Sequence, residues 1–143
     1  AGAQKRGAYR RKFDFLIKEL EFIDVQKCSF FVYGENAGAS PDGLVDNDAI
    51  LEIKCPRSTK FFKLVKDNEI DKNYIDQMQM QMICTNSVRA HFFNYIIFNG
   101  VEMWHEIVVE RDENRIELIK QRINEASKLK EEFKQYLINN KQF

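Results

Sequence analysis

The chain has 143 residues, of which 44% are hydrophobic and 31% charged, and its 22 basic and 22 acidic side chains give a formal net charge of zero. This hydrophobic share excludes an intrinsically disordered chain, which combines low hydrophobicity with an excess of one charge. The balanced charge excludes binding of nucleic acid through overall charge, so any DNA contact has to come from local basic clusters.

The length predicts one domain, residues 1–143. The cysteines, Cys28, Cys55 and Cys84, lack the spacing of a zinc site, and we interpret them as reduced thiols of a cytoplasmic protein. No apolar run approaches the roughly 20 residues of a membrane span. The chain begins with polar and basic residues, which is not the pattern of a secretory signal.

The first predicted element is an amphipathic helix over residues 3–23, because apolar side chains recur there at steps of three and four residues. A basic cluster over residues 5–12 opens this helix, and it either contacts DNA phosphates or forms a solvated surface. Residues 28–33 predict a short strand. Residues 34–43, rich in glycine and with one proline, predict a loop.

Two short apolar segments, residues 44–45 and 49–53, predict a hairpin that turns at Asn47. Residues 55–73 form a connection with a short helix at its centre. This hairpin is the most informative part of the sequence, because it carries charged side chains where a buried hairpin would have apolar ones.

Residues 73–84 contain an alternating run of glutamine and methionine, residues 77–82, a pattern that also suits a strand. We favour a helix, because both residue types are good helix formers and neither is β-branched. On that helix Tyr74, Gln77 and Gln81 share one face, and Gln79 points away from it.

Residues 88–99 and 102–110 predict two strands around the turn Asn99-Gly100. A long amphipathic helix follows from Asp112, its N-cap, to about Leu137. The order of these elements predicts an α/β fold in which a mixed sheet is flanked by helices.

The charges of the hairpin suggest a site. If the hairpin turns at Asn47, Asp42 lies opposite Glu52 and Lys54 shares their face, while the odd-numbered residues of the strand fill the other face. Facing carboxylates repel one another unless a cation lies between them, and Mg²⁺ takes such ligands together with water and substrate phosphate. The pattern indicates a metal-dependent site for phosphodiester cleavage, with Lys54 orienting a water or stabilising negative charge. The alternative is an exposed hairpin face with a weak ion pair.

The segments "SPDGL" (residues 40–44) and "LEIKCP" (51–56) resemble the central signature of the lambda exonuclease family, the YqaJ-like viral recombinases of the PD-(D/E)XK nuclease superfamily. "YIDQMQ" (74–79) is similar to the Tyr-x-x-Gln-x-Gln helix of that family. "WHEIVVERDE" (104–113) resembles its late strand and the start of its C-terminal helix. The likeness covers residues 37–137 in the right order.

The resemblance implies the PD-(D/E)XK fold, a mixed β-sheet core flanked by helices. It implies a Mg²⁺-dependent exonuclease, with Mn²⁺ as a substitute, that degrades linear double-stranded DNA from its 5′ ends in phage-type homologous recombination. It also implies a phage or prophage protein in the cytoplasm of a bacterial host. A single-strand annealing protein is the implied partner, and a ring-shaped trimer around DNA the implied assembly.

Residue by residue, the resemblance makes Asp42 and Glu52 metal ligands, with the carbonyl of Ile53 completing the shell. Lys54 acts on the nucleophilic water, and Gln77 lies beside the metal. The residues expected to contact DNA are Ser40, Arg57, Lys60, Tyr74, Arg10 and Arg11.

One position departs from the family pattern. The family has a glutamate on its N-terminal helix four residues after a glycine, whereas Gly7 is followed at that spacing by Arg11. The family's region upstream of this helix is also largely missing, which indicates a shortened N-terminus or a compact relative. Two alternatives stay open: another endonuclease or repair nuclease of the superfamily, and a DNA-binding or assembly module of the same fold that has lost cleavage.

Overall fold

The computed structural model describes residues 25–26 and 30–140. The helix predicted over residues 3–23 lies outside these residues, and so do Arg10, Arg11 and Cys28. The described elements follow one another as strands, two helices, two strands and a helix, which is the order predicted from the sequence after its first helix.

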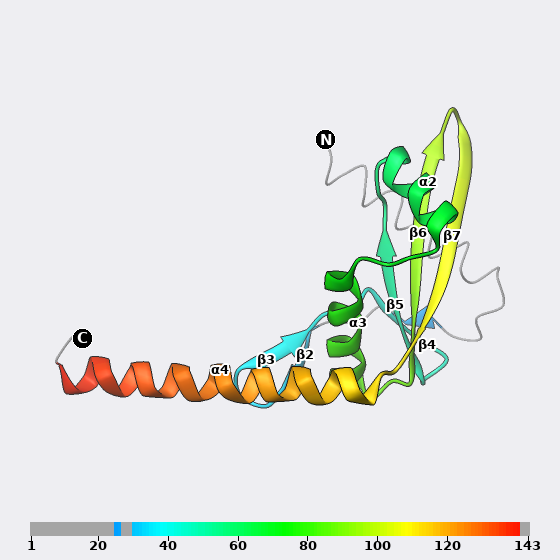
Figure 1. Cartoon of the computed structure of the whole chain (residues 1–143). Coiled ribbons are helices and arrows are strands. Elements are labelled where there is room, and N and C mark those ends of the chain that lie inside the picture. The colour runs from blue at the N-terminus through cyan, green and yellow to red at the C-terminus, as the bar shows by residue number, and fades with distance from the viewer. Residues whose placement is uncertain (1–24, 27–29, 141–143) are drawn as a thin grey trace.

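Five of the described strands form a mixed sheet in the order β1-β4-β5-β6-β7 (Figure 1). Their bounds are β1 Val25–Gln26, β4 Gly43–Val45, β5 Ala49–Lys54, β6 Arg89–Phe98 and β7 Val101–Glu110. β5 and β6 are parallel, whereas the other neighbouring strands are antiparallel. The mixed sheet confirms the predicted fold class, with β5 at its centre.

Tight turns connect the antiparallel pairs β4–β5 and β6–β7. Asp46 and Asn47 have positive φ angles of 52° and 66°, which Asp and Asn tolerate better than other side chains. In the second turn Asn99 and Gly100 take φ angles of 49° and 76°, the backbone that an Asn-Gly hairpin favours. Both turns lie where the sequence predicts them.

A separate hairpin of β2 (Phe31–Tyr33) and β3 (Ala37–Ala39) corrects the loop predicted over residues 34–43. Ala37–Ala39 contains no β-branched or aromatic residue, so its local sequence gives no signal for a strand. Gly38 allows the pairing, because a Cβ at this position would overlap the Phe30 ring and the Phe31 carbonyl.

The described helices are α2 (Ser58–Asp67), α3 (Lys72–Thr85) and α4 (Glu113–Asn139). α3 confirms the helix favoured for the Gln-Met segment, and the side chain of Asp71 caps it by accepting from the Asn73 amide at 2.9 Å. Asp112 caps α4 as predicted. No helix among the described residues offers the long apolar stretch that a membrane crossing requires.

The sheet separates two groups of buried apolar side chains. One joins the odd-numbered residues of β5 to β4 and β6 and comprises Val45, Ala49, Leu51, Ile53, Phe93 and Tyr95. The other joins β5 and β6 to α3 and comprises Ile50, Met78, Met82, Ala90 and Phe92. Because side chains alternate along a strand, α3 covers the face of β5 on which Glu52 and Lys54 lie.

α4 starts beside α3 and extends well beyond the sheet (Figure 1). The guanidinium of Arg115 ties its first turns to α3 by donating two hydrogen bonds of 2.6 Å to Asp76. Further along, Asn36 of the β2–β3 turn bonds to Ser127 and Lys130 at 3.2 and 2.6 Å. Beyond this contact most residues of the helix are exposed.

Candidate active site

The β4–β5 hairpin has the predicted register, since residues 43–45 pair with residues 51–49. Asp42 lies just before these pairs. Its carboxylate Oδ2 accepts a hydrogen bond of 2.7 Å from the backbone amide of Ile53, the residue after Glu52. The Asp42 carboxylate is therefore fixed against β5, on the strand that carries the second predicted acid.

Glu52 is only 4% exposed, and three donors surround its carboxylate. The ammonium of Lys54 lies 3.2 Å from Oε1, and the side-chain amide of Gln77 approaches the same oxygen at 3.5 Å. The amide of Gln81 donates to Oε2 at 2.9 Å. Both oxygens are held in fixed directions, which a ligand or catalytic carboxylate requires.

Burial raises the pKa of Glu52 above its ordinary value, and the negative charge of Asp42 raises it further. The hydrogen bond from Gln81 and the charge of Lys54 oppose this rise without cancelling it. The electrostatic surroundings therefore disfavour a negative charge at Glu52, and a nearby cation would stabilise it.

The acid pair fits a hard divalent cation. Proteins usually bind Mg²⁺ through one or two carboxylates, with water and substrate phosphate oxygens filling the remaining positions. Within residues 25–26 and 30–140, no cluster of three or more His, Cys, Asp or Glu side chains gathers. The carboxylates that the structure brings together there are those of Asp42 and Glu52.

The glutamines of α3 divide as the helical spacing predicts. Gln77 and Gln81 face Glu52, whereas Gln79 points away and donates to the carbonyl of Glu110 at 3.0 Å. Gln79 also accepts from the amide of Asp112 at 3.0 Å, so it joins α3 to the start of α4. Gln81 is the site residue that the sequence analysis missed, although its spacing of four from Gln77 was the available signal.

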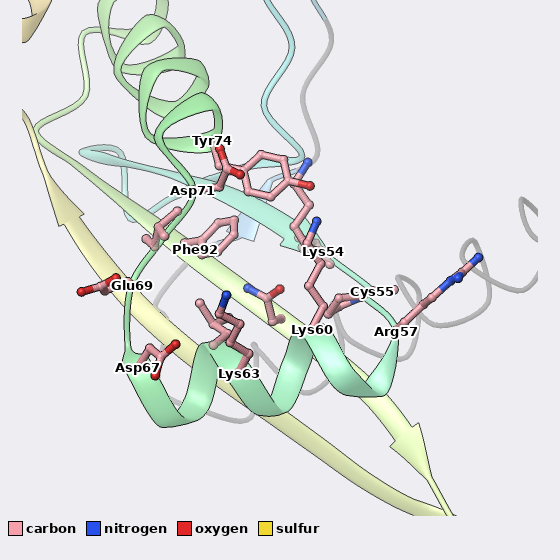
Figure 2. Close-up of a pocket in the computed structure, with 15 residues that line it drawn as sticks. Lys54, Cys55, Arg57, Lys60, Lys63, Asp67, Glu69, Asp71, Tyr74 and Phe92 are labelled. Carbon is pink, nitrogen blue, oxygen red and sulfur yellow. The ribbon is translucent and has the colours of Figure 1, made fainter.

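A pocket of about 720 Å³ opens beyond the end of β5, between α2, α3 and β6 (Figure 2). Its basic lining residues are Lys54, Arg57, Lys60 and Lys63, and its acidic ones are Asp67, Glu69 and Asp71. Tyr74 and Phe92 give the pocket aromatic surface. An anionic group is attracted to the basic wall, which begins at the predicted catalytic lysine.

The structure brings together three of the predicted DNA contacts, Arg57, Lys60 and Tyr74, all of which line this pocket. Ser40 is exposed and precedes Asp42 by two residues, outside the pocket lining. Arg10 and Arg11 lie outside the described residues, so their predicted contacts stay predictions.

Comparison with known proteins gives one family and several solved structures. The model of the YqaJ-like viral recombinase domain matches residues 8–88. The search of curated proteins finds no significant match.

The solved structures cover nearly the whole chain. An alkaline exonuclease, LHK-Exo, from Laribacter hongkongensis has a TM-score of 0.79 and 27% identity, over 95% of this chain and 71% of that one. LHK-Exo in complex with dAMP has a TM-score of 0.79 and 25% identity, over 96% of this chain and 72% of that one. A phage-related exonuclease from Haemophilus somnus 129PT has a TM-score of 0.75 and 15% identity, over 94% of this chain and 73% of that one. This last likeness concerns the fold alone.

Proposed function

The chain belongs to the YqaJ-like viral recombinase family, and from that premise we propose that it is a Mg²⁺-dependent DNA exonuclease of homologous recombination. The likeness to LHK-Exo, an alkaline exonuclease, supports this activity. The observation that carries the proposal is the gathering of Asp42, Glu52 and Lys54, of which Lys54 also lines the pocket with Arg57 and Lys60.

Asp42 and Glu52, with the carbonyl of Ile53, would hold the cation. Mn²⁺ would substitute for Mg²⁺, because carboxylate, carbonyl and water oxygens suit both ions. When bound, the cation supplies a lowered pKa to the attacking water and neutralises charge on the phosphoryl group. The raised pKa of Glu52 supports this assignment, since its causes are those that a cation would relieve.

The protein's own groups orient the reaction. Lys54 either orients the attacking water or stabilises the negative charge that develops on the phosphate, because its ammonium reaches the same small space as Glu52. Gln77 and Gln81 bind the two oxygens of Glu52 and keep the carboxylate from rotating. The two glutamines thus fix the orientation of the Glu52 carboxylate.

The basic groups around the site would bind the DNA backbone. Arg57 and Lys60 lie three and six residues after the end of β5, in the pocket that Lys54 also lines. Phosphate contacts of this kind provide most of the affinity of a nuclease for DNA without sequence preference. We assign the same role to Ser40, Arg10 and Arg11, whereas Tyr74 lines the pocket with its aromatic ring.

The resemblance to the family motivates several finer proposals. We propose that residues 1–143 act as one nuclease domain that degrades linear duplex DNA in the 5′→3′ direction and leaves a 3′ overhang. A ring-shaped trimer around DNA and a single-strand annealing protein as partner belong to the same proposal, as does a phage or prophage origin in the bacterial cytoplasm.

The test uses linear duplex DNA labelled at the 5′ or the 3′ end, and closed circular duplex of the same sequence. We expect mononucleotides from the 5′ ends of linear DNA with Mg²⁺ or Mn²⁺, and none after chelation. Release from 3′ ends would contradict the direction, and cutting of closed circles would identify an endonuclease.

Replacement of the catalytic lysine isolates the chemistry from binding. We expect Lys54→Ala to lower the cleavage rate at least about a hundredfold, because one charge that stabilises the transition state is lost. Its affinity for the same DNA, measured by fluorescence anisotropy, should change by less than about threefold, since several other phosphate contacts remain. An unchanged cleavage rate would contradict the role of Lys54.

A DNA-binding module without cleavage is the second candidate. It is favoured by Arg11, which stands where the family has a glutamate, and by the absence of a third clustered acid in the described part of the chain. DNA binding with no nucleotide release at any concentration of Mg²⁺ or Mn²⁺ would select this candidate over the exonuclease.

A further inference from the structure

We propose that Tyr74 is a positioning residue that holds the ammonium of Lys54 in the active site through the face of its ring. This inference rests on the proposed function for the role of Lys54. Lys54 Nζ lies 4.5 Å from the centroid of the Tyr74 ring, well inside the roughly 6 Å limit of a cation–π interaction. In Figure 2 both Lys54 and Lys60 extend toward this ring, and Lys60 Nζ lies 5.8 Å from its centroid.

Lys54 needs a second anchor because its long side chain is flexible. The side chain is 23% exposed, and its ion pair with Glu52 is the polar contact that fixes its position. When Glu52 shares its charge with a divalent cation, that ion pair weakens, since the cation repels the ammonium. The ring of Tyr74 attracts the ammonium but is not a ligand for a hard cation. The cation–π contact with Lys54 would therefore persist when the site holds its divalent cation.

The Tyr74 ring is itself held by the packing around it. It lies in the first turn of α3, which the Asp71 cap defines. It packs partly buried against the apolar group around Met78, and its centroid lies 5.7 Å from that of the Phe92 ring. A rigid ring restrains a flexible lysine at little entropic cost, because the ring has already lost its freedom on folding.

The Tyr74 ring also links the active site to the pocket. Lys54 lies at the carboxylates and Lys60 in the basic wall of the pocket, and Tyr74 attracts both ammonium groups. The attraction offsets part of the repulsion between the two lysines. Tyr74 therefore holds two positive charges near one ring, where the proposed function has the DNA backbone bind.

The experiment compares Tyr74→Leu with its matched control Tyr74→Phe. Leucine keeps an apolar side chain without an aromatic face, whereas phenylalanine keeps the face and removes the hydroxyl alone. We expect Tyr74→Leu to lower the single-turnover cleavage rate at saturating DNA about tenfold, and Tyr74→Phe to stay within about twofold of the wild type. The apparent DNA affinity should change less than the rate, because the phosphate contacts remain.

A second readout follows Lys54 directly and needs no activity. Lysines labelled by reductive ¹³C-methylation keep their charge, and the Lys54 signal is identified by its absence from Lys54→Arg. A ring beneath the ammonium shifts this signal upfield, so we expect the shift in the wild type and in Tyr74→Phe, with and without Mg²⁺, and its loss in Tyr74→Leu. Should Tyr74→Leu not fold, Tyr74→Met takes its place with the same expectation.

The outcomes separate the two proposals. Equal rates for the leucine and phenylalanine variants, or an unshifted Lys54 signal in the wild type, would overturn the positioning role. If no variant and no wild-type protein cleaves DNA while the shift is lost only in Tyr74→Leu, the proposed function fails and the positioning of Lys54 by Tyr74 stands.

Discussion

The two faces of β5 differ in their chemistry, although their side chains alternate along only six residues. On one face Ala49, Leu51 and Ile53 are at most 2% exposed and pack among apolar neighbours. On the other face Glu52 is almost as buried, at 4%, but is surrounded by charged and amide groups. Side chains on the two faces are thus similarly buried, but one face packs apolar groups and the other surrounds a carboxylate with polar partners.

The apolar face of β5 stabilises the fold, whereas the face that carries Glu52 reduces its stability. Burying an apolar side chain stabilises the fold by roughly 1.5–3 kcal/mol, whereas a buried carboxylate requires compensating partners. The raised pKa of Glu52 indicates that its partners do not compensate fully. Substitutions on the two faces should therefore separate activity from stability.

The largest expected effect comes from the charged face. We expect Glu52→Gln to lower the cleavage rate at least about a thousandfold, equivalent to about 4 kcal/mol, because a neutral amide binds a hard cation poorly. In the metal-free protein the same change should alter the free energy of unfolding by less than about 2 kcal/mol, because the loss of a disfavoured buried charge opposes the loss of the ion-pair partner of Lys54. Single-turnover cleavage with Mg²⁺ and urea unfolding in chelator measure the two effects on one preparation.

The environment of Gln81 explains why this variant should still fold. The side-chain carbonyl of Gln81, Oε1, is buried with no hydrogen-bond partner in the described structure, while its amide donates to Glu52. A glutamine at position 52 offers an oxygen for that amide and an NH₂ group for the orphaned carbonyl. A loss of more than about 2 kcal/mol in the metal-free protein would refute the view that the charged face is costly.

The apolar face should respond in the opposite way. We expect Leu51→Ala to lower the free energy of unfolding by about 3 kcal/mol, because it leaves a cavity at a side chain that is fully buried. The cleavage rate of the molecules that remain folded should stay within about threefold of the wild type, since Leu51 points away from Glu52. Urea unfolding and single-turnover cleavage are the measurements.

Leu129→Ala on α4 is the matched control for this change, because Leu129 is 65% exposed. The same truncation there should cost less than about 0.5 kcal/mol. Equal losses at Leu51 and Leu129 would mean that the apolar face of β5 does not carry the stability assigned to it.

This contrast between the faces was predictable because it depends on local rules. The turn at Asn47 fixes which residues pair, and the two-residue period of a strand then assigns each side chain to a face. The N-cap at Asp112 and the helix of the Gln-Met segment are local in the same sense. Each follows from a few neighbouring residues.

What the sequence did not predict depends on contacts between distant segments. Gln81 lies 29 positions from Glu52, and its bond to that carboxylate requires the exact placement of α3 over β5. The contact of Lys54 with the Tyr74 ring has the same origin. β3 pairs with β2 without any local β preference, because Gly38 admits the close approach of its partner. Helical spacing gives the face of a residue but not the distance to its partner.

The smallest expected effect lies on the surface, where α4 meets α3. Asp76 accepts both hydrogen bonds of the Arg115 guanidinium, and these bonds hold the pKa of Asp76 below its ordinary value. Because the folded state favours the ionised carboxylate, the stabilisation is present above the ordinary pKa of aspartate and is lost as the pH falls through the lowered value.

We expect Asp76→Asn to lower the free energy of unfolding by about 0.5–1 kcal/mol at neutral pH, and the two proteins to converge in acid. Thermal unfolding across the acidic range measures this, with Glu117→Gln as control, because Glu117 is 66% exposed and lies 3.8 Å from Lys120. A difference that persists below the lowered pKa would mean that Asp76 joins α3 to α4 by packing and not by its charge, so that the stability of this junction follows the rule of the apolar face of β5.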